Sequence, residues 1–93
     1  MEVPDAIDVR VSDDTLMVEL SDGRTIAVPL DWYPRLKYAT AEERRNWRLI
    51  GGGQGIHWED LDEDISVKGL LAGKPSGESQ ASFTKWLKNR SID

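Results

Sequence analysis

Residues 7–30 read IDVRVSDDTLMVELSDGRTIAVPL, and this stretch decides the fold class. Apolar residues alternate with polar ones in three short runs: Ile7, Val9 and Val11, then Leu16, Val18 and Leu20, then Ile26, Val28 and Leu30. Alternation with a period of two is typical of strands that bury one face. Turn-forming residues separate the runs, so the stretch predicts a three-stranded antiparallel meander.

The register of this meander follows from its apolar pattern, because paired antiparallel residues point to the same face of a sheet. A two-residue first loop at Asp13-Asp14 predicts three pairs: Val11 with Leu16, Val9 with Val18, and Ile7 with Leu20. A three-residue second loop over residues 21–23, with Gly23 in a left-handed conformation, predicts two more: Val18 with Ile26 and Leu16 with Val28.

The composition indicates one small domain and excludes several classes of site. The chain has 93 residues, no cysteine and a formal net charge of −5, so it has one core and no disulfide or thiolate chemistry. The acidic balance argues against nucleic acid as a partner. No apolar run approaches the ~20 residues of a membrane helix, and the first residues resemble no signal peptide. We therefore expect a cytoplasmic protein without a membrane partner.

Beyond the meander, the sequence predicts a second hairpin and two or three short helices. Pro34 favours a short helix after it, and a capping box from Thr40 to Glu43 opens another over about residues 41–46. Two apolar stretches then flank the glycine run at residues 51–55, which predicts a short hairpin. The run lacks the following helix of a phosphate-binding loop, so we expect its glycines to serve positive φ angles or close backbone approach. The fold class is thus α+β, with one domain over residues 1–75.

The most biased segment carries five acids in six residues, over residues 59–64. Asp64 or Ser66 can cap a helix at residues 67–72 that ends at Gly73, but capping leaves carboxylates in surplus. The spacing is not that of an EF-hand, and no residue pair fits a nucleophile and its base. The sequence predicts no enzyme, no cofactor and no metal site, and it leaves weak cation binding by the acids open. The surplus favours a basic protein partner, contacted by Trp58, Glu59, Asp60, Asp62, Glu63 and Asp64.

Residues 76–93 form a linker and a short amphipathic helix that must dock to be stable. Phe83, Trp86 and Leu87 share one face of this helix. They can pack on the chain's own sheet or on another chain, and we count them among the candidate partner contacts. A homodimer is compatible with either arrangement.

Several strings of the sequence resemble the bacterial family catalogued as domain of unknown function 2442. They lie at residues 21–24, 56–58, 61–67 and 69–73, and the resemblance covers about residues 3–75. It implies a small α+β fold with an N-terminal antiparallel sheet. Stand-alone relatives are often encoded beside a small partner protein, and such pairs look like toxin–antitoxin modules in which this half would be the antitoxin.

Our leading prediction is a non-enzymatic protein-binding module, the antitoxin-like partner of a small basic bacterial protein. One alternative is a DNA-associated transcriptional regulator, which would use the basic residues between Arg35 and Arg48 and those of the tail. Another alternative is a small structural or phage-type protein.

Overall fold

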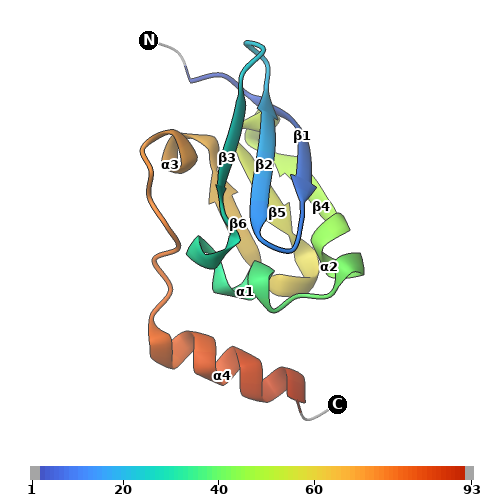
Figure 1. Ribbon diagram of the computed structural model, residues 1–93, viewed down its shortest axis with the longest axis vertical. Helices are drawn as coiled ribbons and strands as arrows, with labels where there is room; N and C mark the ends of the chain where they lie inside the picture. Colours follow the sequence, from blue (N-terminus) through green and yellow to red (C-terminus); the bar gives the residue numbers. More distant parts are fainter. Residues whose placement is uncertain (1–2, 92–93) are drawn as a thin grey trace.

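The computed structural model describes residues 3–91 and contains two three-stranded antiparallel sheets that pack face to face (Figure 1). The first sheet has the order β1-β2-β3, with the strands Ala6–Val11, Thr15–Leu20 and Thr25–Pro29. The second has the order β4-β5-β6, with the strands Trp47–Ile50, Gly55–Trp58 and Glu63–Ser66. The predicted α+β class is confirmed.

The first sheet is the predicted meander, and most of its register is confirmed. Four of the predicted pairs are present: Val11 with Leu16, Val9 with Val18, Leu16 with Val28, and Val18 with Ile26. Gly23 has a φ of 94°, and its N–H donates to the carbonyl of Leu20 at 3.0 Å. The second turn therefore has the left-handed glycine that the pattern required.

The fifth predicted pair, Ile7 with Leu20, is wrong because β1 contains an irregularity between Ala6 and Asp8. Ala6 takes the place opposite Leu20 and is buried, whereas the Ile7 side chain turns outward and is 56% exposed. The backbone before β1 is held by Ser21, whose N–H donates to the carbonyl of Asp5 at 2.8 Å.

The second sheet contains the predicted hairpin and one strand that was not predicted. β4 pairs with β5 across the short 3-10 helix η2 (Gly51–Gly53). The acidic segment then returns as β6, which pairs with β5 after the 3-10 turn η3 (Glu59–Leu61). Asp62 joins η3 to β6 in a left-handed conformation with a φ of 49°. The acidic segment thus forms η3 and the start of the edge strand β6, and is not only the cap of the following helix.

Gly53 shows why the glycine run is needed. Its φ is 100°, and a Cβ at this position would lie 2.7 Å from the Cβ of Asp5 and 3.0 Å from the carbonyl oxygen of Ala6. Gly52 also has a positive φ, of 67°, but space for a Cβ is open there. The glycine run therefore has both expected properties, positive φ angles and a close backbone approach. The close approach occurs where η2 meets the start of β1.

The hydrophobic core fills the space between the two sheets. It contains inward-facing residues of both sheets together with the short elements at their ends: Ala6, Val9, Leu16, Val18, Leu20, Val28, Leu30, Tyr33, Leu36, Ile56, Trp58, Leu61, Ile65, Val67 and Leu70. Sheets that pack in this way alternate inward apolar residues with outward polar ones.

Short helices close the ends of the sheets. After η1 (Leu30–Trp32), α1 (Pro34–Lys37) begins at its proline, as expected, and α2 (Ala41–Arg45) has the full capping box between Thr40 and Glu43. In α3 (Val67–Leu71) the side chain of Ser66 accepts from the N–H of Gly69 at 2.9 Å, so Ser66 is the cap.

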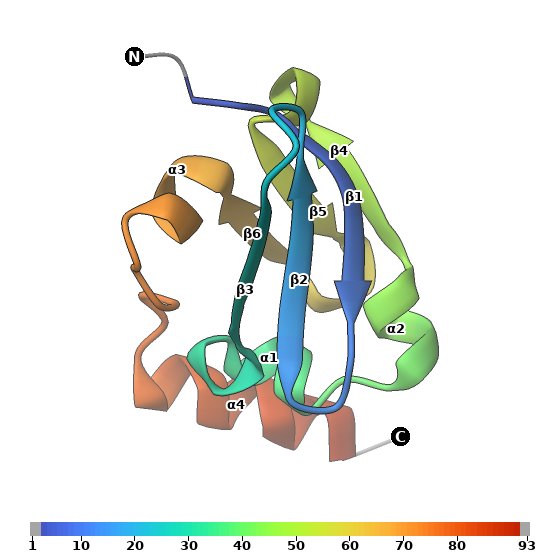
Figure 2. The ribbon, with the colours of Figure 1, turned by 45° about the horizontal axis from the view of Figure 1, so that its top comes forward.

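The last helix, α4 (Gln80–Ser91), lies across the bottom of the molecule, beneath α1 (Figures 1 and 2). Phe83 is 8% exposed, with its ring centroid 5.5 Å from that of Tyr38 and 5.9 Å from that of Trp86. The helix thus docks on its own chain, at the helical end of the domain instead of on an open sheet face. Within residues 3–91, no helix is long and apolar enough to cross a membrane.

Candidate functional site

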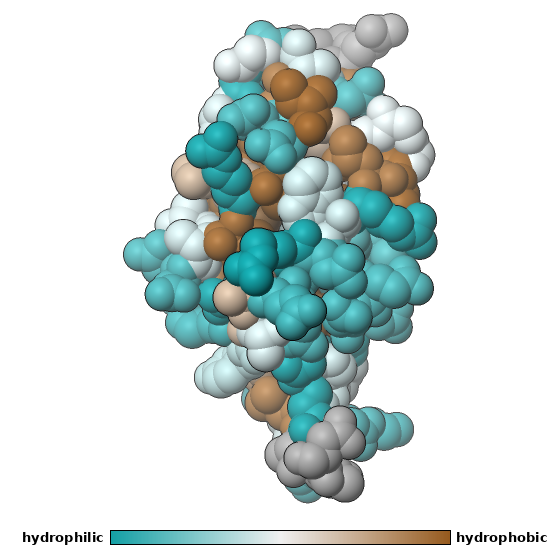
Figure 3. All heavy atoms as spheres, turned by 90° about the vertical axis from the view of Figure 1, so that its right-hand side faces the viewer, coloured by the Kyte–Doolittle hydropathy of each residue, from teal (hydrophilic) through white to brown (hydrophobic). Residues whose placement is uncertain are grey.

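The exposed acids of residues 59–64 form one surface at the junction of η3 and β6. We call Glu59, Asp60, Asp62 and Asp64 the acidic corner. Asp60 accepts a hydrogen bond from the side chain of Asn46 at 2.9 Å, and Glu59 lies 3.5 Å from the guanidinium of Arg48. Seen from the side of β1, β4 and α2, apolar side chains gather in the upper half, and the middle of this face is mainly hydrophilic (Figure 3).

His57 links two members of the acidic corner on the outer face of the second sheet. Its Nδ1 lies 2.5 Å from a carboxylate oxygen of Asp64, and its Nε2 lies 2.8 Å from one of Glu59. The pKa of His57 is raised, chiefly by the hydrogen bond to Asp64 and also by the bond to Glu59. A protonated His57 would neutralise part of the acidic corner.

Glu63 behaves differently from the four exposed acids because it lies on the inward side of β6. It pairs with Trp58 across the ladder, and the next inward position of β6 is the buried Ile65. Burial raises the pKa of Glu63 to about 7; Arg35 opposes this, while Glu78, Asp64 and Asp62 add to it. A carboxyl thus occupies a register position where the sheet otherwise buries apolar side chains, and such departures are typical of functional sites.

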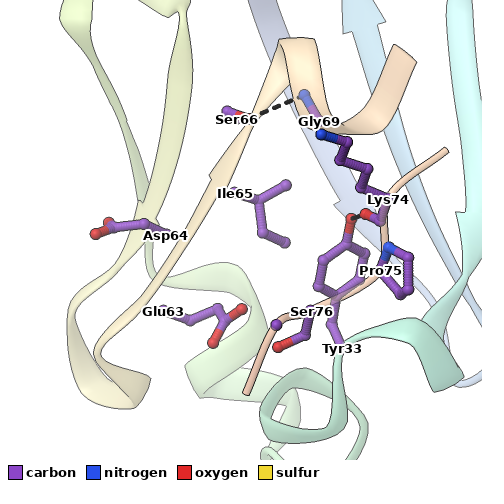
Figure 4. Close-up of a pocket in the computed structure, with 10 residues that line it drawn as sticks. Tyr33, Glu63, Asp64, Ile65, Ser66, Gly69, Lys74, Pro75 and Ser76 are labelled. Carbon is purple, nitrogen blue, oxygen red and sulfur yellow. Dashed lines mark hydrogen bonds between the residues drawn. The ribbon is translucent and has the colours of Figure 1, made fainter. Parts of the chain in front are cut away.

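A cavity of about 230 Å³ lies beside Glu63, between β6 and the linker that follows α3. Its lining includes Tyr33, Glu63, Ile65, Lys74 and Ser76, and Figure 4 shows the Glu63 carboxyl and the Tyr33 ring facing the same hollow. The Tyr33 hydroxyl donates to the carbonyl of Lys74 at 3.2 Å. The pKa of Tyr33 is raised by burial and by the charge of Glu63.

Arg35 connects the acidic corner with α4. Its Nη1 donates to the carbonyl of Leu61 at 2.8 Å, and its Nε lies 3.0 Å from both carboxylate oxygens of Glu78. The side chains of Arg35 and Glu78 are 16% and 11% exposed, so this ion pair is screened little by solvent. The pKa of Glu78 is lowered, mainly by the hydrogen bonds from Arg35. The guanidinium also lies over Trp86, 5.4 Å from the ring centroid.

A second arginine holds the other end of α4. Arg90 donates two hydrogen bonds to the carboxylate of Glu43, at 2.7 and 2.8 Å, and lies 4.6 Å from the ring centroid of Trp86. The pKa of Glu43 is lowered to about 2, chiefly by the hydrogen bonds from Arg90 and to a smaller extent by the hydrogen bond from the backbone N–H of Thr40. Trp86 therefore lies within cation–π distance of two arginines.

The structure divides the predicted partner contacts into exposed and enclosed residues. Trp58 is fully buried, and its indole N–H donates to the carbonyl of Arg44 at 3.1 Å, so it is a core residue and leaves the set of surface contacts. Phe83 of α4 is buried where the helix docks against Tyr38, whereas Trp86 and Leu87 are half-buried. The residues that sequence reasoning missed are Tyr33 and Arg35, which are distant in the chain from the acidic segment.

Within the described residues, no group of three or more histidine, aspartate or glutamate side chains is placed to hold a metal ion. Figure 4 shows the Asp64 side chain directed away from Glu63, so these two neighbouring carboxylates do not converge.

The comparisons with known proteins point to a family without an assigned function. A crystal structure of a protein of unknown function from Rhodospirillum rubrum is 31% identical, with a TM-score of 0.71 over 88% of this chain and 99% of that one. A solution NMR structure of an uncharacterized protein from Chromobacterium violaceum is 25% identical, with a TM-score of 0.65 over 87% of this chain and 74% of that one. A comparison with curated proteins found no match.

The family model described as "Protein of unknown function (DUF2442)" matches residues 6–76. This range contains both sheets, the acidic corner and Glu63, whereas α4 follows it. The chain belongs to the DUF2442 family of proteins of unknown function.

Proposed function

We propose that this chain is a non-enzymatic protein-binding module whose acidic corner contacts a basic protein, in the manner of an antitoxin-like partner of a small bacterial protein. The observation that carries the proposal is the placement of four exposed carboxylates over η3 and the start of β6. Among the described residues, Arg48 and His57 pair with members of this group, and Arg35 acts on Asp62 through its charge. Such a surface attracts a positively charged partner over long range and repels acidic ones.

The pairing of the basic residues favours a protein partner over DNA. Four of the basic side chains between residues 35 and 48 lie within 4 Å of a carboxylate oxygen on this chain: Arg35, Lys37, Arg44 and Arg48. A cation that already neutralises a carboxylate contributes less to the release of counterions on which DNA binding depends.

The test is co-expression of this chain with the small basic proteins that neighbouring genes encode, followed by co-purification. We expect a stable complex after co-expression, with association that slows as salt rises. A double variant, Asp60→Asn with Asp62→Asn, removes two exposed charges of the corner and should slow association about 3–10-fold, because charges at the rim of an interface act mainly on the association rate.

The matched control removes two charges from the opposite side of the molecule. Asp8 and Glu19 pair across β1 and β2, and both approach Arg10 at 3.8 Å on the outer face of the first sheet. Asp8→Asn with Glu19→Gln should change the association rate less than about twofold, because these charges lie away from the corner. An equal effect of both double variants would assign the attraction to net charge and contradict the proposal, as would isolation of the chain without any basic partner.

A further inference from the structure

The cavity between β6 and the linker has the size of a single side chain. Its volume of about 230 Å³ lies below the ~300–1,000 Å³ of pockets for drug-sized molecules. Asp64 belongs both to its lining and to the acidic corner, so the cavity borders the surface that we assign to a basic partner. A partner on the corner would thus have the cavity within reach of its side chains.

Glu63 is aimed into this cavity without a hydrogen-bond donor of its own (Figure 4). Among residues 3–90, no side chain or backbone group donates a hydrogen bond to its carboxylate. Arg35 is close enough to act on Glu63 electrostatically, but its hydrogen bonds go to Glu78 and Leu61. The side chain of Lys74 runs along the other wall toward Gly69, away from the carboxyl (Figure 4).

The same chain shows twice how it satisfies a half-buried carboxylate. Arg35 pairs with Glu78 and lies over Trp86, and Arg90 pairs with Glu43 and lies over the same ring. Each case combines a carboxylate, an aromatic face and a guanidinium that contacts both. Arginine suits this arrangement because its planar fork bonds a carboxylate bidentately while its face stacks on a ring.

Glu63 and Tyr33 form a third carboxylate–aromatic pair, and within the described residues no cation is hydrogen-bonded to its carboxylate: Arg35 acts on Glu63 through its charge alone, and Lys74 lines the cavity but is directed toward Gly69. Tyr33 is 4% exposed and its hydroxyl is used by the carbonyl of Lys74, so what it offers the cavity is the part of its ring that lines the wall. A cation there would meet the ring and the carboxylate together, and it would also offset the burial of Glu63.

We propose that this cavity is a receptor site for one arginine side chain of the basic partner, which forms an ion pair with Glu63 and packs against the part of the Tyr33 ring that lines the wall. The inference rests on the proposed function, because the partner supplies the arginine. The exposed acids of the corner then guide the partner, and Glu63 contributes the buried, short-range contact that fixes its position.

The experiment follows the cavity amides by NMR while methylguanidinium is added to the full chain at pH 8, where Glu63 is ionised. The amides of Ser66, Gly69, Ser76 and Gly77 report on the cavity wall. We expect saturable shifts at these amides, and about fivefold weaker binding in Glu63→Gln, which removes the charge-assisted bond. Glu19→Gln makes the same replacement on the outer face of the first sheet, away from the cavity, and should change binding less than about twofold. Methylammonium, which cannot bond bidentately, should bind more weakly than methylguanidinium.

Three results would overturn the inference: no shifts at the cavity amides, equal binding by Glu63→Gln, or binding of methylammonium as tight as that of methylguanidinium. Failure of the proposed function looks different. If methylguanidinium binds as expected but no basic protein forms a complex, the cavity is still a guanidinium site. The idea that a protein partner supplies the guanidinium group is then overturned. If the complex forms and Glu63→Gln binds the partner unchanged, the corner acts without the cavity.

Discussion

Replacing Glu63 by glutamine should stabilise this protein, and the gain should grow as the pH rises. The carboxyl sits on the inward side of β6, and burial raises its pKa from 4.5 to about 7. Between these two pH values the folded protein binds more protons than the unfolded chain. The free energy of unfolding therefore falls as the pH rises through this window, and the loss is complete above pH 7. Glutamine keeps the shape of the side chain and removes the titration.

The size of the effect follows from the shift. A change of that size in pKa corresponds to at most about 3 kcal/mol, and solvent screening of the half-buried carboxyl reduces it to about 1–2 kcal/mol. The groups facing Glu63 act in both directions: Arg35 lowers its pKa, whereas Glu78, Asp64 and Asp62 raise it. With a urea dependence of ~1–2 kcal/mol per M for a chain of this size, the midpoint at pH 8 should move by about 1 M.

Urea unfolding at several pH values from 5 to 8, followed by tryptophan fluorescence, measures this effect. Trp58 is fully buried, so its environment reports on the core. The difference between Glu63→Gln and the wild type should be small at pH 5 and largest at pH 8. Glu19→Gln is the control, because it makes the same replacement at a half-exposed position on the outer face of the first sheet, and its effect should not depend on pH in this window. A Glu63→Gln variant that is less stable than the wild type at pH 8, or a difference independent of pH, would refute the reasoning.

Three further predictions address the glycine run, α4 and the histidine of the outer face. Gly53→Ala should destabilise the protein by about 2–4 kcal/mol, because a positive φ and a steric clash act together at this position. Gly52→Ala meets only the positive φ and should cost about 1 kcal/mol. Thermal unfolding of both variants measures this difference in stability. Phe83→Ala should lower the hydrogen-exchange protection of α4 amides at least about tenfold while β2 keeps its protection, and the exposed Thr84→Ala should leave both unchanged. His57 gains its carboxylate partners on folding, so its raised pKa stabilises the fold at acidic pH, and this contribution is lost as the pH rises through the folded pKa. His57→Gln should therefore reduce the dependence of the free energy of unfolding on pH in this window. An NMR titration that gave an unshifted pKa for His57 would contradict the prediction.

The meander shows how far sequence patterning reaches and where it stops. Alternation and loop length predicted the pairing of β2 with β3, because both features are local. The outward turn of Ile7 was not predictable in this way, since it depends on contacts of Asp5 with Ser21 and Gln54 from distant parts of the chain. A run that alternates perfectly gives no sign of an irregularity that such contacts impose.

The acidic segment marks the other limit. Its excess of carboxylates correctly predicted an acidic surface, but aspartate and glutamate are rare in strands, so β6 was not expected. Trp58 was placed on the surface, although its spacing from Ile56 puts both on one face of a strand and could have identified it as core. The cavity and the role of Arg35 depend on α1, β6 and the linker coming together, which no local pattern encodes.

The attachment of α4 has a consequence for how this protein can change over evolutionary time. The last buried residue of the connected core is Leu70, inside the range that the family model matches, and α4 is attached to this core by the packing of Trp86, by two arginines and by the contact of Phe83 with Tyr38. Selection can therefore lengthen, exchange or delete the helix without rebuilding the two sheets. Its deletion would uncover the Arg35 guanidinium on the side of Trp86, while the linker residue Glu78 and the carbonyl of Leu61 would still hold that side chain in place.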